Sequence, residues 1–116
     1  MKPTPIEVLF LSELPGEVAP HVASMRGRGM SVEVASHPDR ALELVRRRPH
    51  LVVVDLIHGP GLDPRVVEAL NQEPRASRVV ALHEGSIEAY LDQVEDLTVD
   101  GFCRIASLAG APSAGM

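Results

Sequence analysis

The stretch Pro49-His50-Leu51-Val52-Val53-Val54-Asp55-Leu56 decides the fold of this chain. Four consecutive apolar residues favour a strand buried on both faces, because a half-exposed strand would alternate apolar with polar side chains. Pro49 prevents a preceding helix from continuing, and Asp55 brings a carboxylate to the end of the strand. A strand buried on both faces is typical of a parallel sheet that is covered by helices on either side.

The segments around this stretch alternate between strand and helix patterns. Strands are expected at residues 6–11, 31–35, 51–54, 79–82 and 101–105, and helices at 15–26, 38–48, 63–70 and 86–94. Because crossovers between parallel strands are right-handed, this order predicts a doubly wound α/β domain with a five-stranded parallel sheet. The 116 residues suffice for one such domain.

Composition and charge exclude several classes of protein. The formal net charge of −5 argues against a nucleic-acid partner, and no apolar run reaches the ~18 residues of a membrane span. With a single cysteine, Cys103, and no signal-peptide pattern, we expect a cytoplasmic protein. The one basic run, Arg46–Arg48, complements the dipole at a helix end or contacts a partner.

Candidate site residues follow the strands, because ligands of an open parallel sheet bind at the carboxyl ends of its strands. Ser12 and Glu13 follow the first strand, Asp55 the third, and His83 the fourth. The chain contains no nucleophile elbow, phosphate-binding glycine loop or dinucleotide fingerprint. We therefore expect no catalytic residues and no enzymatic activity on an external substrate.

The chain resembles the receiver domain of bacterial response regulators over residues 6–107. Residues 49–56 are similar to the strand of that family whose last aspartate accepts a phosphoryl group, here Asp55. Residues 39–43 resemble the helix before that strand, and residues 29–35 fit the glycine and second strand of the family. The resemblance implies a flavodoxin-like fold with strand order 2-1-3-4-5.

The resemblance also implies a site that this sequence has partly lost. Family members hold Mg²⁺ with an acid pair after the first strand together with the phosphoacceptor, and the ion neutralises charge on the transferred group. The pair is Ser12-Glu13 here, so that Glu13 and Asp55 are the remaining metal candidates. We expect no cofactor, and Mg²⁺ only if the site still works.

Two further positions depart from the family pattern. His83 stands where the family has a threonine or serine, and Ile105 stands at the position of its phosphate-binding lysine. Arg104 is one residue away from that position, but neighbours along a strand point to opposite faces. Ser12, His83 and Ile105 are therefore the degenerate positions of the site.

The family normally has a fifth helix, and nothing after Ser107 resembles it. We expect residues 1–107 to form one receiver-like domain and residues 108–116 to be a disordered tail or the start of a linker. Apolar surface left bare near the fourth and fifth strands would favour a protein partner or a homodimer.

Three hypotheses of function follow. The first is a pseudo-receiver, a phosphorylation-independent protein-interaction module of bacterial two-component signalling, with its interaction surface around Tyr90, Phe102 and Arg104. The second is an atypical receiver that is phosphorylated on Asp55 with Mg²⁺. The third is a metal or small-ligand site that Glu13, Asp55, His58 and His83 form at the ends of the strands, since imidazole and carboxylate together suit Zn²⁺ or Fe²⁺.

Overall fold

The computed structural model describes residues 5–57, 63–72, 77–94 and 97–104. In these residues five parallel strands form one sheet in the order β2-β1-β3-β4-β5. The strands are β1 (Val8–Leu11), β2 (Val32–Ala35), β3 (Leu51–Asp55), β4 (Arg78–His83) and β5 (Gly101–Arg104). The predicted fold class and strand order are both confirmed.

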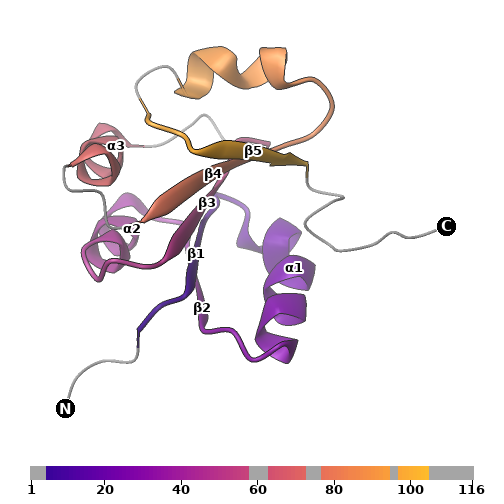
Figure 1. The fold of residues 1–116 in the computed structure, drawn as a ribbon, viewed down its shortest axis with the longest axis vertical. Helices are drawn as coiled ribbons and strands as arrows, with labels where there is room; N and C mark the ends of the chain where they lie inside the picture. The colour runs from indigo at the N-terminus through magenta and orange to yellow at the C-terminus, as the bar shows by residue number, and fades with distance from the viewer. Residues whose placement is uncertain (1–4, 58–62, 73–76, 95–96, 105–116) are drawn as a thin grey trace, which may run out of the picture.

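Helices connect the strands and cover both faces of the sheet. They are α1 (Pro15–Gly27), α2 (Pro38–Val45) and α3 (Pro64–Asn71), with a 3₁₀ helix, η1 (Ile87–Val94), between β4 and β5. α1 lies on one side of the sheet, α2 and α3 lie together on the other side, and η1 lies beyond β5 (Figure 1). None of the described helices is long and apolar enough to cross a membrane.

Alternation along the strands divides the core into two layers. In β1, Leu9 and Leu11 face α2 and α3, whereas Val8 and Phe10 face α1, because successive side chains of a strand point to opposite faces. The first layer joins strand residues to buried side chains of α2 and α3: Ala41, Leu44, Val45, Val66 and Leu70. The second joins Phe10, Val53 and Leu82 to Val18 and Val22 of α1.

Proline and aspartate start the helices as expected. Pro38 begins α2, and Pro64 begins α3, where the side chain of Asp63 accepts a hydrogen bond from the backbone N–H of Arg65. This N-cap satisfies a donor that the first turn of a helix leaves unpaired.

Two helices differ from the prediction. α2 ends at Val45, before the arginine run, because the backbone turns there and reaches a φ of 56° at Arg48. The segment predicted as a fourth helix forms the 3₁₀ helix η1, with Ile87 and Leu91 exposed. Exposed apolar side chains contribute little packing, and packing supplies most of the stability of a helix in a protein. The predicted tail at residues 108–116 lies outside the described residues.

Candidate functional site

Three buried polar side chains lie at the carboxyl ends of the strands. Ser12 directly follows β1, Asp55 is the last residue of β3, and His83 is the last residue of β4. They are 4%, 6% and 3% exposed, and they are the buried polar residues of the described part of the chain. All three were predicted as site residues, and parallel strands bring them to the same edge of the sheet.

The carboxylate of Asp55 accepts hydrogen bonds from a side chain and from the backbone. The hydroxyl of Ser12 donates to Oδ2 at 2.7 Å, and the backbone N–H of Ile57 donates to Oδ1 at 2.9 Å. The Ser12 oxygen in turn accepts from the backbone N–H of Leu14 at 3.2 Å. A buried carboxylate is expensive to leave without donors. Ser12 and Ile57 therefore let Asp55 remain inside the fold.

A cavity of about 330 Å³ opens beside Asp55, between the ends of β1, β2 and β3 and the first turns of α2 and α3. Three carboxylates line it, from Glu13, Asp55 and Asp63, and the described residues of its wall include no arginine or lysine. The backbone N–H of Arg65 holds the pKa of Asp63 below its ordinary value. A wall with several carboxylates attracts cations and repels phosphate groups.

His83 belongs to a second hollow. Its Nδ1 lies within hydrogen-bond distance, 3.2 Å, of the carbonyl oxygen of Gly85. The ring meets Phe102 edge to face, with centroids 6.2 Å apart. His83, Phe102 and the exposed Arg104 line a hollow of about 740 Å³ with the first turn of η1. Asp55 and His83 therefore line different cavities.

The structure gives no support to the predicted transition-metal site. No group of three or more His, Cys, Asp or Glu side chains in the described ranges could hold a metal ion. His83 and Glu13 line separate cavities. His58, the fourth candidate ligand, lies outside the described residues.

Solved structures with a similar arrangement of strands and helices include receiver domains. The signal receiver domain of the response regulator NarL from Mycobacterium tuberculosis is 21% identical, with 88% of this chain and 85% of that chain covered and a TM-score of 0.64. The receiver domain of a sensor histidine kinase from Pseudomonas aeruginosa was solved with a magnesium ion coordinated in its active-site cleft. It is 12% identical, with 88% of this chain and 86% of that chain covered and a TM-score of 0.69.

A third neighbour is a response regulator from Burkholderia pseudomallei, solved with a phosphorylated aspartic acid, calcium ion and citrate. It is 20% identical, with 94% of this chain and 61% of that chain covered and a TM-score of 0.64.

The chain has the receiver fold. No protein-family model matches the sequence, and no curated protein sequence matches it. The likeness is therefore one of fold, and it agrees with the resemblance that the sequence suggested.

Within the receiver fold, the candidate positions separate into two places. Ser12, Glu13 and Asp55 line one cavity, while Phe102 and Arg104 line the other hollow. Arg104 pairs with His83 in the register of β4 and β5. Tyr90 lies on η1, but its side chain, like the whole of Ile105, lies outside the described residues.

Sequence reasoning missed some residues of the Asp55 cavity. Asp63 supplies a third carboxylate, and residues 36–38 line the wall at the start of α2. The signal was present in the Asp63-Pro64 pair, which predicts a helix start. In a parallel sheet, a helix that follows a strand begins near the carboxyl end of that strand, and therefore near the site.

Proposed function

We propose that this domain is a pseudo-receiver, a protein-interaction module of bacterial two-component signalling that works without phosphorylation of Asp55. The observation that carries the proposal is the environment of Asp55. A serine hydroxyl, from Ser12, donates to its carboxylate at 2.7 Å from the position where the family has an acidic residue. The receiver fold of the chain supports the signalling context.

Phosphoryl transfer to an aspartate needs cations that neutralise the developing negative charge. The described wall beside Asp55 includes no arginine or lysine, and the single lysine of the chain is Lys2, far in sequence from β5. His83, at the threonine position of the family, hydrogen-bonds the carbonyl of Gly85 in a different hollow. These side chains support the proposal that the domain has the receiver fold but does not carry out phosphoryl transfer to Asp55.

The candidate Mg²⁺ ligands of this chain are Glu13 and Asp55. Mg²⁺ requires near-octahedral coordination by hard oxygen ligands, and both oxygens of Asp55 accept hydrogen bonds from the protein. Ser12 offers a neutral hydroxyl where a second full charge would be needed. We therefore expect weak or no binding of Mg²⁺.

The interaction surface that we propose lies around η1 and β5. Ile87 and Leu91 are 37% and 49% exposed on η1, and Phe102 and Arg104 line the hollow beside it. Exposed apolar side chains next to a cation and an aromatic ring are typical of protein interfaces. Tyr90, on the same helix, is the further candidate for this surface.

The test is incubation of the purified chain with Mg²⁺ and acetyl phosphate, followed by mass spectrometry of the intact protein. We expect no mass gain of one phosphoryl group and no shift of the melting temperature by Mg²⁺ alone. Asp55→Asn is the matched control, because it removes the acceptor oxygen with little change in shape. Stoichiometric phosphorylation that Asp55→Asn abolishes would overturn the proposal.

One observation favours the second candidate, an atypical working receiver. Asp55 ends β3 of a receiver fold and lines an open cavity together with Glu13. The same experiment separates the two candidates, since only the working receiver gains the phosphoryl group. A melting temperature that rises with Mg²⁺ in the wild-type chain and stays constant in Asp55→Asn would also favour this candidate.

A further inference from the structure

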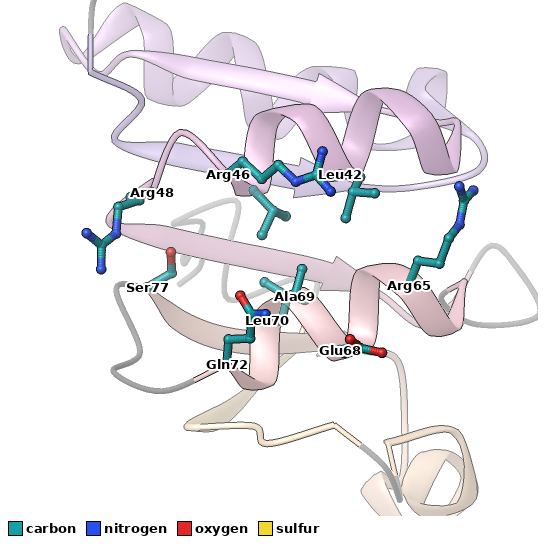
Figure 2. Close-up of a pocket in the computed structure, with 10 residues that line it drawn as sticks. Leu42, Arg46, Arg48, Arg65, Glu68, Ala69, Leu70, Gln72 and Ser77 are labelled. Atoms are coloured by element: carbon teal, nitrogen blue, oxygen red, sulfur yellow. The ribbon is translucent and has the colours of Figure 1, made fainter.

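A groove runs between α2 and α3, on the face of the molecule away from α1. Its volume is about 470 Å³, and its walls combine apolar side chains with arginines (Figure 2). Val45 and Leu70 are buried beneath it, whereas Leu42 and Ala69 are half-buried and reachable from outside. The remaining lining residues are polar: Arg46, Arg48, Arg65, Glu68, Gln72 and Ser77.

The groove is basic although the chain as a whole carries a net charge of −5. Three arginines and one glutamate, Glu68, line it. Arg65 is paired with Asp39 and Asp63, each at 3.2 Å. Arg46 and Arg48 have no ion pair or hydrogen-bond partner for their guanidinium groups in the part of the chain that the structure describes. Two arginines are thus available to an anionic ligand.

Arg48 is held in an unfavourable backbone conformation. Among the described residues it is the one non-glycine residue with a positive φ, 56°, where the chain turns away from the end of α2. Glycine or asparagine is favoured at this position after a helix, because other side chains crowd the backbone there. Strained residues of this kind often belong to functional sites, and here the strained residue places a guanidinium at one end of the groove.

The arrangement of the arginines indicates the shape of the ligand. Figure 2 shows Arg48, Arg46 and Arg65 spread out along the groove instead of gathered around one point, with Arg48 at one end and its guanidinium pointing outward. Such spacing suits an extended ligand with several negative groups better than a single small anion. The groove is about 12 Å long, since each flanking helix has eight residues. About four residues of an extended peptide span that length.

The apolar floor distinguishes a peptide from a nucleic acid. Leu42 and Ala69 offer contact to an apolar side chain, which a peptide can supply and a phosphate backbone cannot. We propose that the α2–α3 groove binds an acidic peptide segment of a partner protein. Its carboxylates meet Arg46 and Arg48, and an apolar side chain packs on Leu42 and Ala69.

This groove shares no described lining residue with the Asp55 cavity or with the hollow beside β5, so that its test does not require Asp55 to be phosphorylated or unphosphorylated. The test uses a display library of random heptapeptides and the intact chain as bait. We expect the selected peptides to be enriched in Asp and Glu with apolar residues between them. Their binding, measured by fluorescence polarisation of labelled peptide, should weaken at least about tenfold in a variant with Arg46→Gln and Arg48→Gly.

Arg28→Gln is the matched control, because Arg28 is the C-cap of α1 as Arg46 is that of α2, and it lies outside the groove. Peptide affinity should be unchanged in this variant. Glycine fits the φ of Arg48, so that Arg48→Gly alone should keep a melting temperature equal to or above that of the wild type while it weakens binding. Backbone amide NMR shifts on peptide addition should map to α2 and α3.

Three outcomes would overturn the proposal. One is selection of peptides without acidic residues, or of none that bind in solution. Another is equal affinity of the selected peptides for the double variant and the wild type, or NMR shifts confined to η1 and β5. The third is tighter binding of a single-stranded oligonucleotide than of any peptide, with the same dependence on Arg46 and Arg48.

Discussion

At the scale of single residues, the pairing of Ser12 with Asp55 has the largest consequence. A neutral hydroxyl 2.7 Å from Oδ2 lets the carboxylate stay 6% exposed without a second acid nearby on β1. Two carboxylates at this distance would repel each other strongly in a buried place. Ser12 therefore stabilises the metal-free fold, but it lacks the carboxylate charge that would help to bind a metal ion.

Ser12→Asp tests this interpretation by restoring the acid pair of the family. We expect a loss of stability of about 2 kcal/mol in EDTA, since a hydrogen-bond donor is lost and a like charge is gained in a buried place. Mg²⁺ should restore part of that loss, because the cation relieves the repulsion. The measurement is the melting temperature with EDTA and with Mg²⁺.

Ser12→Asn is the control for this variant, because it has the same shape without the charge. Its melting temperature should not depend on Mg²⁺. Equal responses of the two variants to Mg²⁺ would mean that position 12 has no influence on metal binding.

Ser12, Asp55 and His83 were predictable from the sequence, but their contacts were not. A carboxylate after a run of valines marks the end of a buried strand, and this pattern identified Asp55. Whether His83 would join it depended on side-chain direction at the ends of two strands. The contact of the His83 ring with Phe102 is a tertiary feature that no local pattern contains.

At the scale of elements, α3 depends on its first turn. Asp63 accepts a hydrogen bond from the backbone N–H of Arg65 at 2.8 Å and also pairs with the guanidinium of the same residue. These contacts hold the pKa of Asp63 below its ordinary value. The stabilisation they provide is therefore fully present above the ordinary pKa of an aspartate, and it is lost as the pH falls through the lowered pKa of the folded state.

Asp63→Asn should reduce this acid dependence. Asparagine still caps the helix, so that the melting temperature at neutral pH should change little. The fall in melting temperature between neutral pH and about pH 2 should be smaller than in the wild type, because the titrating carboxyl is gone. Glu43→Gln removes an exposed carboxylate that pairs with Arg40 on α2, and this control should keep the wild-type acid dependence. The same fall in both variants would contradict the assignment to Asp63.

The elements differ in how well the sequence predicts them. Pro38 and the Asp63-Pro64 pair placed the starts of α2 and α3 correctly, since proline and an N-cap act locally. The segment that became η1 has apolar residues at helical spacing, yet Ile87 and Leu91 are exposed. The spacing indicated a helix, but the choice between α and 3₁₀ depends on packing against the sheet, which the local sequence does not contain.

At the scale of the whole molecule, the order of segments predicted a doubly wound parallel sheet, and the resemblance to receiver domains supplied the strand order. Apolar strands joined by helices require a parallel sheet with two covered faces, and the right-handed crossover leaves few strand orders. The sheet is not equally packed across its width, however. All four residues of β1 are buried and so are four of the five in β3, whereas none of the four residues of β5 is buried.

This gradient predicts where the native structure opens first. β5 is an edge strand that pairs only with β4 in the described sheet, and its residues from Gly101 to Cys103 are half-buried. Few buried contacts mean a low free energy of local opening. In hydrogen-exchange mass spectrometry we expect β5 and η1 to exchange fastest and β1 and β3 to exchange slowest, near the rate of global unfolding.

Cys103 offers a second readout of the same opening. Burial raises the pKa of its thiol, so that little thiolate is present while β5 is in place, and alkylation of a cysteine requires the thiolate. Alkylation by iodoacetamide should therefore be slow in the native chain, and it should accelerate at urea concentrations below those that unfold β1 and β3, because β5 separates first. If alkylation of Cys103 and hydrogen exchange of β3 instead show the same dependence on urea, the sheet opens as a single cooperative unit. The uneven burial across the sheet would then have no effect on local stability.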